Sequence, residues 1–521
     1  MAAVAVTVLS AGLLGAALLA WPSARLGASD DALARVVLPG FAGTVTAVDV
    51  RSADGARVPV RLSQGKLWPL HKLAVGERLK VVLKVRRPGW AAWLVGRSEQ
   101  RNLTIETPSA HLLGHWLQVK AGAPITVTFD RPVSLVSLGK ARSRRLASPS
   151  AIVPLGLVAR GSHSSGGMEV AAAARSWERL PAPVWVSWFP ERPYLQLLAQ
   201  PEPGTTLAPG GQLTLAFSSS VSAVLGTRRP RLSPATPGRW RLLDAHTLAF
   251  RPSGLGFGLG AKVRVVLPRA AHLAGRPGSK MTRKLDWQVT NGSTLRLQQL
   301  LAQLGYLPLH WLAGASVAST PEAQLAAALS PPPGQFFWRY GNTPPELRAL
   351  WRAGQANQIT RGAVMMFQDT HHLVVDALVG PKVWQALIAD TVAGKRRSSG
   401  YSYVYVHRET PQSLNLWHNG KVILSSPGNT GVPEAPTQLG TFLVFEHIPV
   451  GTMSGTNPNG SHYRDPGIRY ISYFNHGEAI HAFNRSSFGT PQSLGCVELP
   501  LAAAAKVWPY TPIGTLVTVE N

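Results

Sequence analysis

The segment "HAFNRSSFGTPQSLGCVELP" runs from His481 to Pro500 and contains Cys496, the one cysteine among 521 residues. A thiol at its ordinary pKa is mostly protonated at neutral pH, and its nucleophilic form is the thiolate. A histidine within hydrogen-bond reach can remove that proton if a third group orients the imidazole. His481 lies in "AIHAF", which is typical of a strand end. The segment therefore predicts a strand, then a loop that returns the thiol beside the imidazole.

Gly495 allows the backbone to approach a ligand closely, so the amides of Gly495 and Cys496 are candidates for holding an oxyanion. The connecting "NRSSFGTPQS" has the Ser, Gly and Pro of a tight loop. Two structural interpretations stay open at this point. A cysteine followed by valine can be a buried apolar residue, and a single histidine can be structural.

The surrounding sequence alternates strongly between apolar and polar residues. Residues 401–431 read "YSYVYVHRETPQSLNLWHNGKVILSSPGNTG", in which "HNG" (418–420) predicts a tight turn between two strands. We therefore expect a mainly β domain over 401–521.

These residues resemble the signature of the L,D-transpeptidase (YkuD-type) family, which has a histidine, a loop, and then Ser/Thr-His-Gly-Cys with a hydrophobic residue. His481, Ser493, Gly495, Cys496 and Val497 fall on that pattern. Upstream, "NTGVPEAPTQLGTFLVF" and "RYISYFNHGEAIHAF" are similar to strands of the family, so the resemblance covers nearly all of the last domain.

Two positions depart from the family pattern. Leu494 stands where the family commonly has His, and Glu498 where it commonly has Arg or Asn. A glutamate two residues from a thiolate disfavours the negative charge if it is near and buried. We expect Glu498 also to alter how a substrate carboxylate is held, and Leu494 and Glu498 are both candidate substrate-binding residues.

The resemblance implies a cysteine acyl-transfer cycle on peptidoglycan stem peptides, with no metal or other cofactor. Cys496 would attack the carbonyl of the L-centre of the third residue of a tetrapeptide stem and release D-Ala. An amine from a neighbouring stem would resolve the thioester as a 3→3 cross-link. His481 would act as base and then acid, oriented by the Ala482 carbonyl, while Ser493 supports the loop.

The donor side of the implied site includes three further candidates, Tyr470, Tyr473 and His462. The polar stretch "GTNPNGSHYRD" (455–465) predicts a lid or surface loop. No H-E-x-x-H or Cys/His zinc spacing occurs in the sequence.

Upstream of the last domain, the periodicity changes to that of helices. "TLRLQQLLAQLGY" (294–306) places four leucines on one helical face, and residues 359–367 and 379–387 predict two further helices. Gln298 with "LGY", and later Gln368 and Asp376, resemble the peptidoglycan-binding domain of bacterial cell-wall enzymes. Residues 308–357 exceed the usual connection within such a domain.

Between about 36 and 290, β-branched alternation punctuated by Gly and Pro predicts two or three tandem Ig-like β-sandwiches that act as a stalk. Two pairs of segments resemble each other within it. They are "APITVTFDRPVSLV" (123–136) with "GGQLTLAFSSSVSAV" (210–224), and "VGERLKVVLKV" (75–85) with "LGAKVRVVLPR" (259–269).

The fold class expected is thus multidomain and mainly β. The predicted divisions are a signal anchor or signal peptide (1–30), Ig-like domains (31–110, 111–200 and 201–292), a helical peptidoglycan-binding-like domain (293–392), a linker (393–400) and the L,D-transpeptidase domain (401–521).

Residues 2–21, "AAVAVTVLSAGLLGAALLAW", carry no charge. They predict export, either as a retained membrane anchor or as a signal peptide cut near "LGA" (26–28). The remainder would then lie outside the cytoplasm, on the cell-wall side of the membrane.

The net charge of +26 suits an anionic partner such as a cell-wall polymer, or else a solvated basic surface. No nucleic-acid-binding motif accompanies it, so nucleic acid is not an expected partner. Three functions stay open: an L,D-transpeptidase, a non-catalytic cell-wall binding protein, and a cysteine L,D-carboxypeptidase in which water resolves the thioester.

Overall fold

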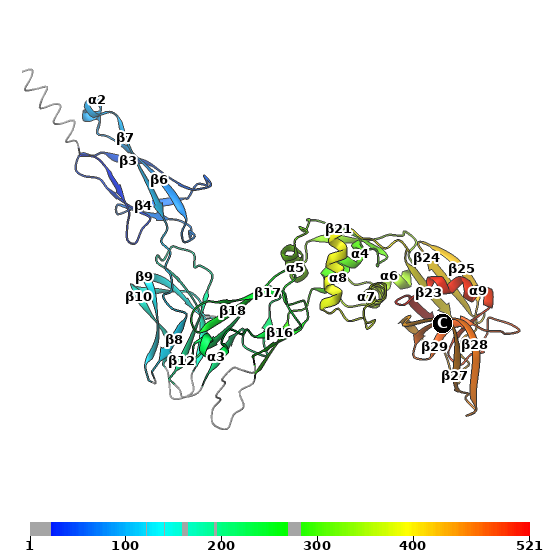
Figure 1. Ribbon diagram of the computed structural model, residues 1–521. Coiled ribbons are helices and arrows are strands. Elements are labelled where there is room, and N and C mark those ends of the chain that lie inside the picture. Colours follow the sequence, from blue (N-terminus) through cyan, green and yellow to red (C-terminus); the bar gives the residue numbers. More distant parts are fainter. Residues whose placement is uncertain (1–21, 121, 140, 159–164, 192–194, 269–282) are drawn as a thin grey trace, which may run out of the picture.

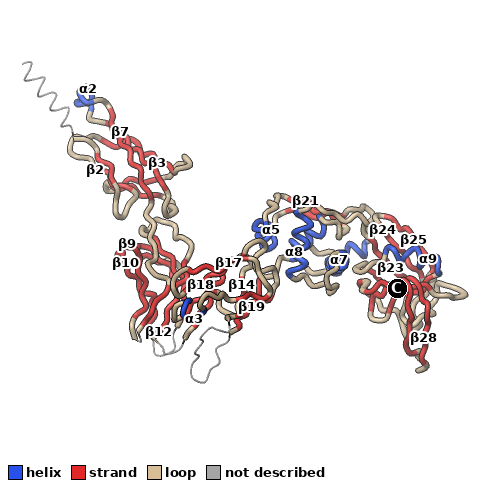
Figure 2. The backbone as a smooth tube through the Cα atoms, viewed as in Figure 1, coloured by secondary structure: helices blue, strands red, loops and turns tan. Residues whose placement is uncertain are grey.

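The computed structural model describes residues 22–120, 122–139, 141–158, 165–191, 195–268 and 283–521 (Figure 1). The apolar segment 2–21 lies outside the described residues. Within the described ranges, no helix is long and apolar enough to cross a membrane. Strands predominate, and the longer described helices gather in one region between Thr294 and Val392, so the predicted mainly β fold is confirmed (Figure 2).

The first domain packs two antiparallel sheets around one core of buried aliphatic side chains. One sheet has the order β1-β2-β5-β4, with bounds Arg25–Gly27, Ala34–Val37, Lys66–Pro69 and Val60–Ser63. The other has the order β3-β6-β7, with bounds Thr44–Ser52, Arg78–Arg86 and Ser98–Glu106. A short 3-10 turn, Gly89–Ala91, and helix α2, Ala92–Val95, lie between β6 and β7.

The second domain is built on one five-stranded sheet of order β10-β9-β11-β12-β8. The bounds are Arg144–Val158, Pro124–Leu138, Gly166–Ala173, Val184–Pro190 and Trp116–Val119. Trp116 joins this domain to the next, because its Nε1 donates to the Phe217 carbonyl at 2.9 Å and its ring stacks on His246.

The third domain is a two-sheet sandwich whose core draws side chains from both sheets. One sheet has the order β13-β15-β18-β17, with bounds Leu197–Gln200, Leu213–Phe217, Thr247–Pro252 and Gly238–Leu242. The other has the order β14-β20-β19-β16, with bounds Thr206–Leu207, Lys284–Val289, Lys262–Val266 and Arg231–Ser233. Helix α3, Val221–Leu225, follows β15.

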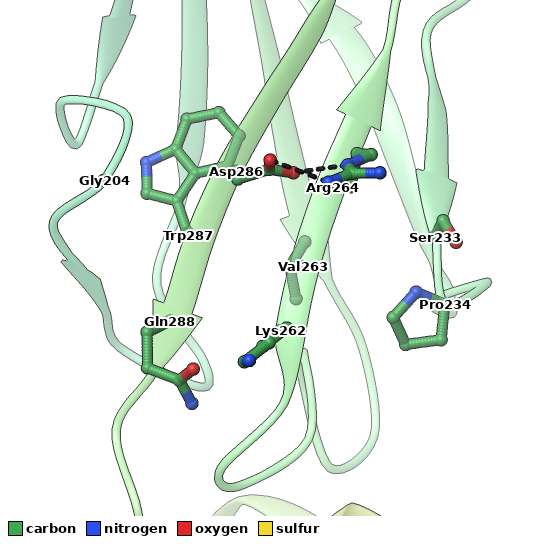
Figure 3. Close-up of a pocket in the computed structure, with 9 residues that line it drawn as sticks. All are labelled: Gly204, Ser233, Pro234, Lys262, Val263, Arg264, Asp286, Trp287 and Gln288. Carbon is green, nitrogen blue, oxygen red and sulfur yellow. Dashed lines mark hydrogen bonds and ion pairs between the residues drawn. The ribbon is translucent and has the colours of Figure 1, made fainter.

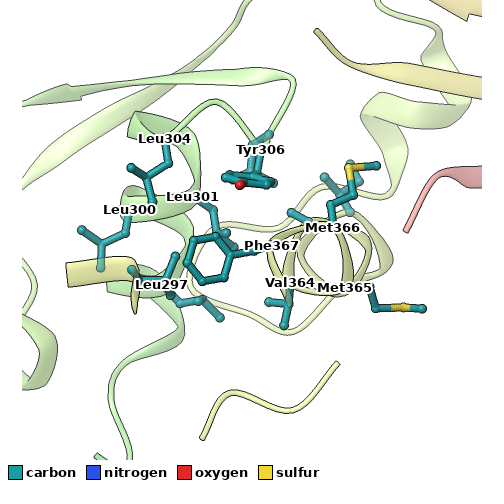
Figure 4. Packing of buried hydrophobic residues seen from close by; sticks show 14 of the residues in the cluster. Leu297, Leu300, Leu301, Leu304, Tyr306, Val364, Met365, Met366 and Phe367 are labelled. Carbon is teal, nitrogen blue, oxygen red and sulfur yellow. The ribbon is translucent and has the colours of Figure 1, made fainter. Parts of the chain in front are cut away.

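The helical region contains the three helices that the periodicity predicts, namely α4 (Thr294–Gln303), α7 (Gln358–Thr370) and α8 (Pro381–Val392). Leucines of α4 pack against Phe367 and Val364 of α7, with Tyr306 closing the group (Figure 4). The long insertion between them folds as a hairpin of β21 (Leu309–Ala313) and β22 (Gly334–Trp338) with two short helices, α5 (Pro321–Leu329) and α6 (Pro345–Ala349).

The last domain has two sheets. The larger has the order β25-β24-β23-β31-β26, with bounds Lys421–Pro427, Ser413–His418, Ser402–His407, Leu516–Glu520 and Gly440–Leu443. The smaller has the order β27-β28-β29-β30, with bounds Glu446–Thr456, His462–Asn475, Glu478–Ala482 and Val497–Leu499. Helix α9, Leu501–Val507, and a 3-10 turn, Trp508–Tyr510, precede β31.

The predicted "HNG" turn joins β24 to β25. Asn419 and Gly420 both have positive φ, 46° and 86°, as the tightest hairpin turn requires. The stretch 455–465 is not a separate loop, because most of it belongs to the long β27–β28 hairpin and only its tip is unpaired.

The larger sheet of the last domain is buried on both faces. Val404, Leu414 and Val517 point into the core shared with the smaller sheet. Tyr403, Trp417 and Leu516 belong instead to the core formed with α4 and α7. The helical region and the last domain therefore share one continuous hydrophobic core.

The segment 393–400, predicted as a linker, is held against the helical region. The amide of Arg397 donates to the Leu304 carbonyl at 2.8 Å, and its guanidinium lies over the Tyr306 ring. The Lys395 ammonium lies 2.8 Å from the Asp390 carboxylate. These contacts restrain the segment 393–400, whose polar composition alone suggests a flexible linker.

Gly362 of α7 gives a stability test of this shared core. An added Cβ there would lie 2.4 Å from the Gly514 carbonyl oxygen and 2.9 Å from Leu443 Cδ2. Helix propensity alone favours Gly362→Ala by about 1 kcal/mol. We expect overpacking to prevail, with a net loss of about 2 kcal/mol.

The measurement is native-state hydrogen exchange of the β31 amides. Gly341→Ala is the matched control, because an added Cβ at that position meets no atom within 4 Å. Equal exchange in the two variants would contradict the close approach of α7 to the last domain.

Candidate functional site

The parallel pairing of β29 with β30 brings the predicted residues to one face of the smaller sheet. In this pair Ile480 lies opposite Val497, and His481 lies opposite Glu498. Because strand residues alternate between faces, Ile480 points into the inter-sheet core while His481 points away from it. Cys496, immediately before β30, packs against Ala479 on this second face.

His481 is buried, and the tautomer of its neutral ring follows from one hydrogen bond. Its Nδ1 lies 3.0 Å from the Ala482 carbonyl oxygen, the contact that the family resemblance implies. Since a carbonyl only accepts, Nδ1 carries the proton and Nε2 keeps its lone pair in the neutral ring. Burial lowers the pKa of His481, so the ring is neutral near pH 7 and Nε2 can accept a proton.

Cys496 is half-buried, and its thiol donates to the Gly477 carbonyl oxygen at 3.6 Å. Burial raises its pKa to about 12; a hydrogen bond from the Ala479 backbone lowers it, and the charges of Glu498 and Glu478 raise it further. Among the described residues, the imidazole of His481 is not a hydrogen-bond partner of this sulfur. The expectation of a direct thiol–imidazole hydrogen bond is therefore not met in this conformation.

The turn before Cys496 is fixed by Ser493 and Gly495. The buried Ser493 hydroxyl donates to the Cys496 carbonyl at 2.6 Å. Gly495 has φ of +105°, a region that L side chains rarely adopt, and an added Cβ would lie 3.4 Å from the Glu478 carboxylate. These two residues orient the backbone amides around the thiol.

Glu498, one of the two departures from the family pattern, is neutralised by a residue that sequence reasoning missed. Arg485 Nη2 and Nε lie 2.7 and 2.8 Å from the two Glu498 oxygens. The guanidinium also donates to the Gln492 carbonyl and lies over the Phe483 ring at 4.6 Å. The signal available was a lone arginine in the polar loop "NRSSFGTPQS". The pair ties this loop to β30.

Asn429 is a second residue that sequence reasoning missed. It exchanges two backbone hydrogen bonds with Glu498, at 3.0 and 2.9 Å. Its buried side-chain oxygen accepts from the Gly489 amide at 2.9 Å. The signal was the "GNTG" (428–431) turn composition, which indicated a loop without indicating its role.

The predicted donor-side residues do not all gather at the thiol. Tyr473 lies opposite Ala479 and packs in the cluster that contacts Cys496. Burial and then the nearby Cys496 raise the pKa of Tyr473, and the same causes raise the pKa of Tyr463, which the sequence did not single out.

Tyr470, His462 and Leu494 lie elsewhere or contribute less. Tyr470 packs against Trp508 and the inter-sheet core, because its position in β28 faces away from Cys496. His462 is exposed at the far end of the β27–β28 hairpin, 3.2 Å from the Thr456 hydroxyl. Leu494 is half-buried in the turn before Gly495.

A cavity of about 630 Å³ opens at the other end of β29. Its walls include Asp465, Arg469, Ala482, Phe483 and Phe488. Phe483 also contacts the His481 ring edge to face, with centroids 5.9 Å apart. The cavity therefore adjoins the imidazole and offers both an acidic and a basic wall.

Other positions in the described chain are less suited to catalysis. No group of three or more His, Cys, Asp or Glu residues there could hold a metal ion. A cavity of about 560 Å³ on the third domain lies beside Lys262, and its Arg264 and Asp286 form a bidentate ion pair (Figure 3). It is lined by no cysteine or histidine.

Comparison with known proteins identifies the last domain. Residues 401–519 match the family model of the L,D-transpeptidase catalytic domain. No curated protein matches the chain.

Solved structures similar to this chain include three L,D-transpeptidases. The enzyme from Mycobacterium smegmatis is 13% identical, with 63% of this chain and 100% of that chain covered and a TM-score of 0.22. L,D-transpeptidase 3 from Mycobacterium tuberculosis is 12% identical, covering 62% and 97%, with a TM-score of 0.21. The catalytic domain of the E. faecium L,D-transpeptidase is 27% identical, covering 23% and 96%, with a TM-score of 0.21.

The charges around Cys496 predict a specific pH dependence of thiol reactivity. With a thiol pKa of about 12, alkylation by iodoacetamide should accelerate about tenfold per pH unit from pH 7 to 10, without a plateau. Glu498→Gln removes a negative charge and leaves Arg485 unpaired, so the thiol pKa should fall. At pH 8 we expect alkylation to be about three- to tenfold faster than in the unaltered protein.

Glu409→Gln, the same charge change at an exposed position of the same domain, is the control and should leave the rate unchanged. A plateau below pH 8, or an identical rate in Glu498→Gln, would contradict the charge arrangement described for the thiol.

Proposed function

We propose that this protein, whose residues 401–519 are an L,D-transpeptidase catalytic domain, forms 3→3 peptidoglycan cross-links through a thioester on Cys496. The observation that carries the proposal is the shared sheet face of Cys496 and His481, with the only imidazole proton committed to the Ala482 carbonyl. An imidazole held in this tautomer can act only through Nε2, which suits a general base.

The reaction begins with a rotation of the thiol from the Gly477 carbonyl toward His481 Nε2. The imidazole takes the thiol proton while sulfur attacks the carbonyl of the L-centre of the third stem residue. The carbon–nitrogen bond to D-Ala then breaks, and the imidazolium returns its proton to the leaving amine. The product is a thioester on Cys496 and free D-Ala.

The second half of the cycle regenerates the thiol. A side-chain amine from a neighbouring stem attacks the thioester carbonyl and gives a proton to His481. The carbon–sulfur bond breaks, a new amide forms, and the imidazolium reprotonates the sulfur. In both halves, the amides of Gly495 and Cys496 are the candidate donors to the tetrahedral oxyanion.

The raised thiol pKa means that deprotonation must accompany attack. A free thiolate is scarce at neutral pH when the thiol pKa is about 12. Burial also lowers the pKa of His481, so its imidazolium form is unfavourable. The imidazole can therefore hold the thiol proton only while negative charge develops on the substrate carbonyl oxygen. Donors to that oxygen therefore contribute directly to thiol activation.

The donor stem peptide has a candidate binding region in the 630 Å³ cavity beside Phe483. A third residue such as diaminopimelate carries an amine and a carboxylate at its side-chain end. Asp465 and Arg469 offer the complementary charges. Outside this cavity, Tyr473, which packs in the same cluster as Cys496, and Leu494, two residues before Cys496, are candidate apolar contacts nearer the thiol.

We propose that the remaining domains position the catalytic domain at the cell wall. The family acts on peptidoglycan, so the catalytic domain works outside the cytoplasm. We assign the three β domains to a stalk, the helical region to peptidoglycan binding, residues 2–21 to membrane attachment, and the basic surface to anionic wall polymers. Because the helical region shares its core with the catalytic domain, peptidoglycan held by one would be close to the other.

One observation favours a second candidate, a non-catalytic cell-wall binding protein. The thiol donates a hydrogen bond to the Gly477 carbonyl, has a raised pKa and lies near two carboxylates. These features suit a cysteine that no longer acts as a nucleophile. A cysteine L,D-carboxypeptidase differs only in using water as the acceptor.

Covalent labelling by a carbapenem tests the nucleophile. Intact-mass spectrometry after incubation should show one adduct, located on Cys496 and absent in Cys496→Ala. His481→Ala should slow adduct formation by about a hundredfold or more, since general base catalysis contributes factors of that order.

The matched control is His310→Ala, an exposed histidine of β21, which should acylate at the unaltered rate. A protein that folds but stays unmodified would favour the non-catalytic candidate. Normal acylation of His481→Ala would require a different base.

A stem tetrapeptide, supplied with and without an acceptor amine, tests the reaction class. With acceptor, we expect a cross-linked dimer and one free D-Ala for each bond formed, and neither product with Cys496→Ala. Tripeptide as the main product, with water as acceptor in both mixtures, would identify the carboxypeptidase instead.

A further inference from the structure

The first domain carries exposed aromatic side chains at one end. Phe41 is 72% exposed, Trp90 64% and Trp93 79%. Phe41 lies in the loop between β2 and β3, and the two tryptophans lie between β6 and β7. The rings of Phe41 and Trp90 are in contact edge to face, with centroids 6.3 Å apart. We call these three residues the aromatic tip.

The two loops of the aromatic tip are packed directly on each other. A Cβ added at Gly43 would meet the backbone of Arg86, so only glycine permits this approach, and φ there is +114°. The tip is thus a defined surface, since its two loops are held together by backbone contact.

The exposed charges of the two loops at this end of the domain are all positive. Arg86 and Arg97 flank the tryptophan loop and are exposed, and neither 38–43 nor 86–97 contains an acidic residue. Arg87, in the same loop, pairs with the buried Glu99 at 3.6 Å. An exposed apolar group bordered by arginines is typical of a surface that meets an anionic lipid layer.

The strand register puts the start of the described chain at this same end. Arg25 of β1 lies opposite Val37, the last residue of β2, and the Phe41 loop follows directly. Residues 2–21, which are apolar and uncharged, end four positions before Arg25. A chain attached to a membrane through that segment would hold the aromatic tip at the lipid surface.

Two further observations fit this orientation. Figure 1 shows α2, which contains Trp93, at the end of the first domain farthest from β9 and β10 of the next domain. Cleavage near 26–28 would remove part of β1, whose Leu26 packs against the domain core. The fold therefore favours retention of the N-terminal segment.

We propose that the aromatic tip docks into the headgroup region of an anionic membrane, independently of residues 2–21. Tryptophan rings suit the boundary between headgroups and acyl chains, because one part of the ring is apolar and the indole N–H is polar. Arg86 and Arg97 would meet lipid phosphates. The docked tip fixes the direction in which the stalk leaves the membrane.

The test uses the 521-residue chain with residues 2–21 replaced by Gly and Ser, so that the leader cannot insert. Co-sedimentation with phosphatidylglycerol/phosphatidylcholine vesicles should show binding. Trp90→Ser with Trp93→Ser should weaken it by about tenfold for each aromatic removed. Leu312→Ser with Phe337→Ser, two exposed apolar residues of the β21–β22 hairpin, is the matched control and should bind normally.

A second pair of measurements separates charge from apolar burial. Arg86→Gln with Arg97→Gln should weaken binding to anionic vesicles by roughly tenfold and leave binding to pure phosphatidylcholine unchanged. Hydrogen exchange of the β6 amides checks that each variant is folded.

Three outcomes would overturn the proposal. The first is that the chain with residues 2–21 replaced does not bind vesicles, and the second is that Leu312→Ser with Phe337→Ser weakens binding as much as the tryptophan variant does. The third is that the tryptophans are needed for binding to isolated peptidoglycan and not to vesicles. Cross-linking of soluble tetrapeptides should be the same in all of these variants, so failure of membrane docking is distinguishable from failure of the proposed function.

Discussion

The parallel pairing of β29 with β30 is the interaction on which the candidate site depends. Its register sets His481 opposite Glu498 and brings Cys496 to the same side of the sheet. A shift by one residue would turn the imidazole into the inter-sheet core, because strand side chains alternate. The Asn429 and Arg485 contacts to Glu498 hold this short strand in place.

The same residues explain how a departure from the family pattern is accommodated. A buried carboxylate at Glu498 opposes ionisation of the nearby Cys496 thiol. Arg485 offsets that charge while also anchoring the preceding loop through Gln492. Glu498, which differs from the family pattern, thus has a structural partner in Arg485. The two residues act as one structural unit.

A second constraint is the double burial of the larger sheet in the last domain. Because Tyr403 and Trp417 pack against helices while Val404 and Leu414 pack against the smaller sheet, the helical region and the catalytic domain form one body. At the other end of the chain, exposed aromatics and a one-sided charge distribution give the first domain a surface suited to lipid. If the three β domains act as the stalk proposed above, they would join a membrane-facing end to a wall-facing end.

The sequence by itself determined the mainly β class, the three amphipathic helices, the "HNG" turn and the identity of the last domain, because periodicity, turn chemistry and a local signature are all encoded by neighbouring residues. It also singled out Cys496, His481 and Glu498. Only the tertiary structure decided that Arg485 and Asn429 contact Glu498 and that Tyr470 faces away from the thiol. It also decided that the Cys496 thiol donates a hydrogen bond to the Gly477 carbonyl in this conformation. Those contacts join segments distant in sequence, and they depend on strand register and burial, which no local pattern specifies.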